Sequence, residues 1–150
     1  KLCNTMLELY QNDGIITEPA GALSVSALDY FQKETIKNKH VVCIISGGNN
    51  DISRYPEIQE FALRYNNLKH YFIINFTQKP GELKKFVNEI LGPDDDITRF
   101  EYIKKTNRSY GQVLVGIETS NIQILKSNLE NKNFNHIYIN DNEQLMSFLI

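Results

Sequence analysis

The chain lacks the features that mark membrane and secreted proteins. It has no apolar run of about 18 residues and no signal-peptide pattern, so we expect it neither to span a membrane nor to cross one by its own signal. Cysteine is scarce, with only Cys3 and Cys43 present and far apart. Two reduced thiols in a cytoplasmic protein therefore fit this sequence better than a structural disulfide.

An excess of charge of either sign is also missing. The chain carries 16 basic and 18 acidic residues, a formal net charge of −2, which gives no support to nucleic acid or an anionic membrane as a partner. His40, His70 and His136 have no metal-ligand spacing to one another or to the cysteines. Gly47-Gly48 lacks the following Lys-Ser/Thr of a phosphate-binding loop. We therefore expect no metal, nucleic-acid or membrane site.

The composition that remains is that of a globular protein. Apolar residues make up 41% of the chain and charged residues 23%, and 150 residues allow one ordinary domain or two small pieces. The sequence begins with Lys1 rather than Met, which suits a piece of something longer.

A buried strand is predicted at Val41–Ile45, because this run has almost no polar atoms and is rich in β-branched residues. Ser46-Gly47-Gly48-Asn49 follows at once and predicts an abrupt polar turn. In open α/β sheets, turns at the carboxyl ends of strands are where ligands bind. An ordinary turn between a core strand and a helix would have the same local pattern.

The first part of the chain alternates between helix and strand. Apolar spacing predicts a helix over the first dozen residues, a short strand at Ile15–Glu18 and a second helix over Ala20–Gln32, before the strand at Val41–Ile45. This alternation is typical of a parallel sheet, but two strands cannot form a doubly wound domain. Partner strands for them must come from elsewhere.

The second part has a cleaner pattern. A helix runs from Ile52 to about Asn66, and the elements predicted beyond it are strand 69–76, helix 82–91, strands 97–103 and 113–117 joined by a turn at 107–109, helix 122–129, strand 136–139 and helix 143–149. The order βαββαβ predicts an α+β domain of ferredoxin-like type.

Two motifs carry a family resemblance. Glu18-Pro19-Ala20-Gly21-Ala22 and Ser46-Gly47-Gly48-Asn49 resemble the end of the catalytic domain of pyridoxal-phosphate-dependent threonine dehydratases, which has the α/β architecture called PLP fold type II. The rest of the chain resembles their ACT-like regulatory domain. The resemblance implies that residues 1–51 are part of the catalytic domain, 52–67 a neck helix and 68–150 the regulatory domain.

The resemblance also implies residues that contact the pyridoxal 5′-phosphate of the full-length enzyme. Ser46 would face the pyridine nitrogen, Gly48 and Asn49 would line the same wall, and Glu18 would face the cofactor edge. A carboxylate at position 18 could equally serve the positive end of the following helix. The Schiff-base lysine and the glycine-rich phosphate loop of the family have no counterpart here, so we expect this chain alone to be inactive.

The regulatory half is expected to bind amino-acid effectors. In the shorter biosynthetic enzymes that the chain resembles, L-isoleucine lowers activity and L-valine can oppose it. The free N–H groups at the start of the helix at Gly81-Glu82-Leu83 could accept the effector carboxylate. Leu83 and Phe86, with Phe100 or Tyr102, would form the apolar wall, although core packing is the plainer role for Leu83 and Phe86.

The resulting hypothesis is the C-terminal region of an enzyme that converts L-threonine to 2-oxobutanoate and ammonia in isoleucine biosynthesis. A dimer or tetramer is the expected assembly, because the exposed sheet surface commonly pairs with a second copy. Two alternatives are a stand-alone amino-acid-sensing module and a related pyridoxal-phosphate lyase acting on serine or a threonine-like substrate. The unpartnered strand before Ser46 argues against the stand-alone module.

Overall fold

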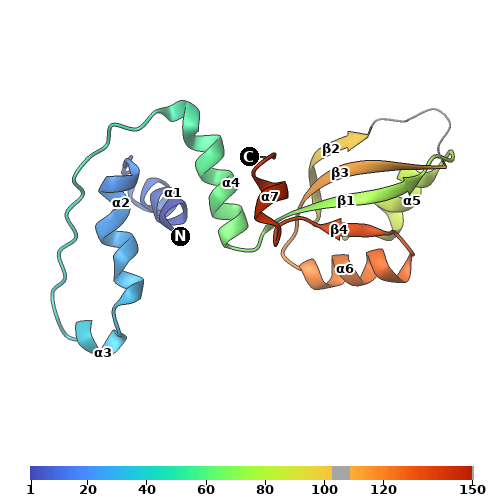
Figure 1. The fold of residues 1–150 in the computed structure, drawn as a ribbon. Coiled ribbons are helices and arrows are strands. Elements are labelled where there is room, and N and C mark those ends of the chain that lie inside the picture. Colours follow the sequence, from blue (N-terminus) through green and yellow to red (C-terminus); the bar gives the residue numbers. More distant parts are fainter. Residues whose placement is uncertain (103–108, 150) are drawn as a thin grey trace. The chain divides into compact units, whose positions relative to one another are not determined.

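The computed structural model describes residues 1–102 and 109–149, so Ile103 and part of the turn predicted at 107–109 lie outside the described residues. The chain divides into two compact units, Lys1–Tyr65 and Asn66–Ile150 (Figure 1). Each unit has apolar clusters of its own.

The second unit is built on a four-stranded antiparallel sheet. Its elements are β1 (Lys69–Thr77), α5 (Glu82–Glu89), β2 (Asp96–Tyr102), β3 (Tyr110–Glu118), α6 (Ile122–Asn131), β4 (His136–Tyr138) and α7 (Glu143–Met146). The strands lie in the order β2-β3-β1-β4, and each neighbouring pair is antiparallel. The predicted α+β domain with a βαββαβ element order is confirmed.

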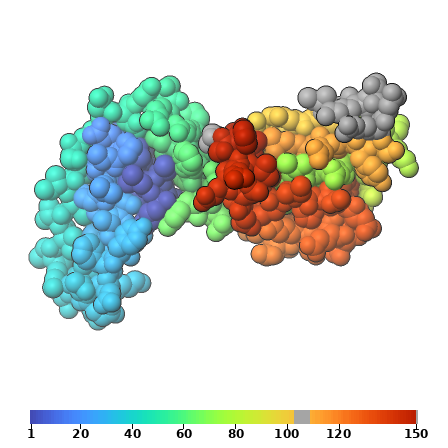
Figure 2. All heavy atoms as spheres, viewed as in Figure 1, coloured from blue at the N-terminus to red at the C-terminus, as the bar shows by residue number. Residues whose placement is uncertain are grey.

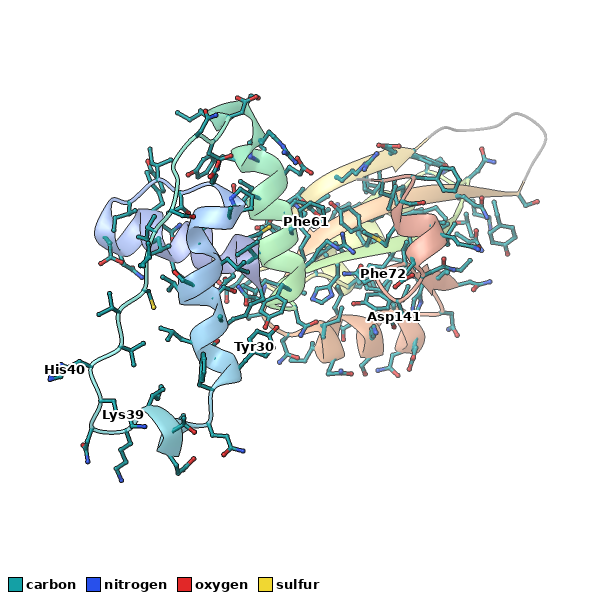
Figure 3. The ribbon with its side chains drawn as sticks, turned by 60° about the vertical axis from the view of Figure 1, so that its left-hand side comes forward. Tyr30, Lys39, His40, Phe61, Phe72 and Asp141 are labelled. Atoms are coloured by element: carbon teal, nitrogen blue, oxygen red, sulfur yellow. The ribbon has the colours of Figure 1, made fainter. Side chains whose placement is uncertain are left out.

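The core of this unit lies between one face of the sheet and the helices α5 and α6. Because side chains alternate along a strand, the even-numbered residues of β1 and the odd-numbered residues of β3 share that face. Phe72, which Figure 3 labels, and Ile74 of β1 lie opposite Val115 and Val113 of β3. All of them are fully buried, together with Phe86, Ile90, Leu125 and Leu129. The alternating pattern therefore sets the register of the two central strands.

The other face of the sheet is covered only in part. Tyr71 of β1, Ile139 and Met146 of α7 form a second cluster, against which Ile73 and Leu114 pack. Arg99 Nη1 also donates to the carbonyl oxygen of Leu149, 3.1 Å away. The short helix α7 thus covers the end of this face that carries Tyr71. We call this side of the sheet the open face; it is formed by odd-numbered residues of β1 and even-numbered residues of β3.

The first unit is mainly helical. It contains α1 (Leu2–Asp13), α2 (Pro19–Ser26), the 3-10 turn η1 (Ala27–Tyr30), α3 (Lys33–Ile36), the 3-10 turn η2 (Ile52–Arg54) and α4 (Tyr55–Tyr65). Met6, Leu9, Ala22 and Ile58 form its buried cluster. Helix α1 ends at Gly14, whose φ of 67° gives the left-handed cap predicted from Asn12-Asp13-Gly14. The single helix predicted over Ala20–Gln32 is interrupted, since α2 ends at Ser26.

The two strands predicted in this unit are wrong for this chain. Neither Ile15–Glu18 nor Val41–Ile45 forms a strand, and Val42 and Ile44 are 86% and 74% exposed. A strand requires a neighbouring backbone to hydrogen-bond with, and the described residues beside Val41–Ile45 are helical. This segment instead contacts α2, where Ser24 Oγ donates to the carbonyl oxygen of Ile44 at 2.9 Å. Figure 1 draws the segment as coil, Figure 3 labels Lys39 and His40 just before it, and Figure 2 shows the unit that contains it with all heavy atoms.

Candidate functional site

In the first unit, the two motifs of the predicted cofactor wall lie side by side. The backbone N–H of Glu18 donates to the carbonyl oxygen of Gly47 at 3.2 Å, and Asn50 Nδ2 donates to the carbonyl oxygen of Thr17 at 3.0 Å. The structure therefore brings Glu18 to the turn that contains Ser46, Gly48 and Asn49. Of these four predicted residues Glu18 is half-buried, and the other three are exposed.

Glycine is required where these two segments meet. A Cβ atom on Gly21 would overlap the carbonyl oxygen of Gly47, and one on Gly47 would overlap the carboxylate of Glu18. A Cβ on Gly48 would lie 2.9 Å from the carbonyl oxygen of Ile16. The glycines at 21 and 48 thus permit a close approach of backbone that a side chain would prevent, whereas the Glu18 carboxylate could move aside for a Cβ at position 47.

This turn exposes several hydrogen-bonding groups. Ser46 presents a hydroxyl and Asn49 an amide, both exposed, and Gly47-Gly48 leaves the adjacent backbone free of side chains. Thr17 Oγ1 is buried beside them and has no hydrogen-bond partner among the described residues. The turn can therefore offer hydroxyl, amide and backbone groups to a polar aromatic ligand.

In the second unit, the residues predicted to bind an effector separate into two groups. Phe86 is fully buried, with ring-centroid distances of 5.2 Å to Phe76 and 5.7 Å to Phe134. Phe100 and Tyr102 also pack around Phe76, with ring-centroid distances of 6.0 and 6.2 Å. Phe86 therefore has no exposed surface to present to a ligand, whereas Phe100 and Tyr102 are partly buried residues packed against the core.

The other group lies at the start of α5. Gly81 precedes the helix with a φ of 91° and supplies no side-chain cap. Leu83 is 46% exposed, whereas the carboxylate of Glu82 accepts a hydrogen bond from Thr77 Oγ1. Leu83 at the start of α5 is therefore accessible, whereas Phe86 one turn later is not. The effector role of all six residues stays a prediction.

A hollow of about 930 Å³ lies on the open face of the sheet, within the size range of small-molecule sites. It is lined by Ile73, Asn75, Thr77, Glu82, Glu101, Ser109, Tyr110, Gly111, Gln112, Leu114, Asn133, Phe134 and Asn135. Glu82 is the only lining residue among the six predicted effector contacts. Sequence reasoning missed Asn75 and Gln112, although a polar amide inside each of two apolar strands was a visible signal.

A buried histidine fixes the start of β1. His70 Nε2 lies 2.9 Å from the carbonyl oxygen of Asn67, and its Nδ1 lies 2.9 Å from the hydroxyl of Tyr138. Because a carbonyl only accepts, Nε2 carries the proton and Nδ1 accepts from Tyr138. Burial lowers the pKa of His70 below 6.5, the bond to Asn67 opposes this shift, and the charge of Lys126 adds to it.

In residues 1–102 and 109–149 no group of three or more His, Cys, Asp or Glu side chains is arranged to hold a metal ion. None of the helices in those ranges has the length and apolar character needed to cross a membrane.

Comparison with known proteins identifies the family. The family described as the C-terminal regulatory domain of threonine dehydratase matches residues 60–149, more than half of the chain. The L-threonine dehydratase biosynthetic IlvA of Staphylococcus saprophyticus is 53% identical over 152 residues, which cover 99% of this chain and 36% of that protein.

Two further relatives with the same name match this chain at similar identity and coverage. The protein of Staphylococcus aureus is 52% identical over 153 residues, covering 99% of this chain and 36% of its own length. That of Halalkalibacterium halodurans is 53% identical over 153 residues, covering 100% of this chain and 37% of its own length. The chain thus spans little more than a third of the relatives it matches. From the match over residues 60–149, the chain belongs to the family of threonine dehydratase C-terminal regulatory domains.

Proposed function

We propose that this chain is the C-terminal region of a biosynthetic threonine dehydratase, in which the unit from Asn66 onward senses an amino-acid end product. The observation that carries the proposal is the family match over residues 60–149, most of which lies in that unit. Residues 1–51 would then belong to the catalytic domain, 52–67 to a neck helix and 68–150 to an ACT-like regulatory domain. The division between Tyr65 and Asn66 supports a boundary at this point.

The reaction proposed for the whole enzyme converts L-threonine to 2-oxobutanoate and ammonia. Bound pyridoxal 5′-phosphate would supply the electron sink for removal of the α-proton. The hydroxyl of Ser46 would hydrogen-bond the ring nitrogen, and a neutral partner there suits elimination better than transamination. Gly48 and Asn49 would line the same wall, with Glu18 held at its edge by the backbone bond to Gly47.

The chain alone should not catalyse this reaction. No lysine in it lies in the sequence context of a Schiff-base residue, and no glycine-rich loop is available for the cofactor phosphate. We expect no 2-oxobutanoate from L-threonine when the purified chain is supplied with pyridoxal phosphate. Detectable 2-oxobutanoate would contradict the proposal that catalysis needs parts of the enzyme outside this chain.

The regulatory role is tested by calorimetric titration of the chain with L-isoleucine and then L-valine. Isoleucine is the proposed inhibitor and valine its proposed antagonist, whereas L-threonine, the proposed substrate, is the control. We expect saturable binding of isoleucine that threonine does not compete for. Absence of binding would count against an autonomous sensor in this chain.

A homodimer or homotetramer is also proposed, and light scattering of the same sample measures its mass.

A further inference from the structure

The open face of the sheet carries a polar-to-apolar gradient along its two central strands. The cross-strand partners on this face are Thr77 and Tyr110, then Asn75 and Gln112, then Ile73 and Leu114. Successive pairs are two residues apart along each strand, which is about 7 Å. Hydroxyls, amides and apolar side chains therefore follow one another in regular steps.

The hollow described above lies over this gradient, because all six of these residues line it. Cross-strand neighbours on one face of an antiparallel pair lie close enough for one small molecule to contact both. The amides of Asn75 and Gln112 can each donate and accept hydrogen bonds. A ligand carboxylate that lies between them would receive two N–H donors.

The charged groups of the hollow favour an ammonium group over a second anion. The carboxylate of Glu82 is oriented by Thr77 Oγ1, and that of Glu101 is paired with Arg99 Nε at 2.7 Å. Among the described residues that line the hollow there is no lysine or arginine. Glu82 is therefore the carboxylate available to a ligand ammonium at the hydroxyl end of the gradient.

The opposite end of the gradient suits an aliphatic side chain. Ile73 and Leu114 are partly buried, and they pack against the cluster that contains Met146 of α7. A branched alkyl group placed on this pair would bury apolar surface against Ile73 and Leu114. This apolar end of the hollow is supported from behind by the cluster that contains Met146.

We propose that the open face of the sheet, rather than the packed side of α5, binds a zwitterionic α-amino acid with a branched aliphatic side chain. Its ammonium group would contact Glu82, its carboxylate would lie at Asn75 and Gln112, and its alkyl group would lie on Ile73 and Leu114. This inference rests on the proposed function and gives a location to the proposed effector site. A hydroxyl in place of a methyl group, as in threonine, would be poorly solvated on the apolar pair, which favours isoleucine and valine.

The decisive variant is Gln112→Glu, which keeps the size of the side chain and places a negative charge opposite the ligand carboxylate. We expect it to weaken L-isoleucine binding in calorimetry by at least about tenfold, the effect of losing one charge-assisted hydrogen bond. Glu82→Gln should weaken binding by a similar factor. Two matched controls change the same groups outside the hollow: Gln123→Glu on α6 and Glu89→Gln on α5. Each control should bind within about twofold of the unmodified chain, on the same scale.

The outcomes separate the location from the function. Glu82 belongs to both candidate sites, so its loss alone does not discriminate between them. If the unmodified chain binds isoleucine and Gln112→Glu binds equally well, whereas Leu83→Ala does not, the site lies at α5 and the open-face proposal is wrong. If the unmodified chain binds neither isoleucine nor valine, the proposed sensing function fails and the open-face site fails with it. Circular dichroism melts of each variant would confirm that it is folded.

Discussion

Each of the two units contains an apolar segment, but one segment is a buried strand and the other is exposed and forms no strand. In the second unit, β1 lies between β3 and β4, and its apolar side chains are buried against α5 and α6. In the first unit, Val41–Ile45 is at least as apolar, yet it stays extended, unpaired with any strand and largely exposed. The comparison shows that an apolar run becomes a strand only where a neighbouring backbone can satisfy its hydrogen bonds.

A destabilising substitution in the core of one unit should leave the stability of the other unit unchanged. Phe86→Ala removes a fully buried ring from the second unit, which we expect to lose about 3–5 kcal/mol of unfolding free energy. Hydrogen exchange read by mass spectrometry should show protection falling in β1, β3 and α6 while α1 and α4 keep theirs. Equal loss of protection in α1 would show that the two units unfold together.

Helix α4 offers the reverse experiment in the first unit. Ala62 is buried in the interior of α4, so Ala62→Pro should break the helix at a cost of about 3 kcal/mol or more. Exchange protection should then fall in α1 and α4 and persist in β1 and β3. If the proposed neck-helix role is right, the same change in the whole enzyme should uncouple inhibition by isoleucine from catalysis. Unchanged isoleucine sensitivity there would exclude α4 from the coupling.

Acid should destabilise the second unit selectively through His70. Because the pKa of His70 is lowered in the folded state, the unfolded chain takes up the proton first, at about pH 6.5. The stabilisation from neutral His70 is therefore complete above that pH and is lost as the pH falls toward the lower, folded-state pKa. Urea unfolding across this range should show the decline, and His70→Gln should remove it.

The matched control for that experiment is His136→Gln. His136 Nδ1 donates to the carbonyl oxygen of Phe134 at 2.9 Å, its ring packs edge-on against Phe72, and it lies on the edge strand β4. We expect this variant to keep the decline below pH 6.5. A decline that survives in His70→Gln would assign the acid sensitivity to other groups.

The smallest expected effects come from one left-handed glycine in each unit. Gly14 has a φ of 67° and Gly81 a φ of 91°, and an added Cβ would meet nothing within 4 Å at either position. The cost of alanine is therefore conformational rather than steric, and we expect about 1–2 kcal/mol in each case. Urea unfolding of Gly14→Ala and Gly81→Ala, followed by exchange in each unit, should place each loss in its own unit.

Prediction from sequence was most successful where a segment's neighbours lie inside the chain. The alternation in β1 and β3 and the apolar spacing of α5 and α6 led to the correct βαββαβ order. For Val41–Ile45 the same kind of pattern predicted a strand that the structure does not contain. The apolar pattern indicates which side chains avoid water, but it does not specify which strand, if any, pairs with the segment.

Prediction of the sites shows the same limit. The structure brings Glu18 to the turn at Ser46–Asn49, as their shared motif context suggested. Phe86, Phe100 and Tyr102, which were predicted to form an apolar effector wall, surround Phe76 in the structure, and their effector role stays a prediction. Asn75 and Gln112 were overlooked because their significance depends on cross-strand register, which joins positions far apart in sequence.

The sequence by itself determined the helices and strands of the second unit, the left-handed turn at Gly14, and the family to which the chain belongs. These follow from the order of neighbouring residues, since helical and strand periodicities and turn preferences act over a few positions. Only the tertiary structure decided that Val41–Ile45 has no strand partner among the described residues, that Phe86 is core, and that Asn75 lies opposite Gln112 on the open face, next to Ile73 and Leu114. Those outcomes depend on pairing and packing between distant segments, and local patterns do not specify them.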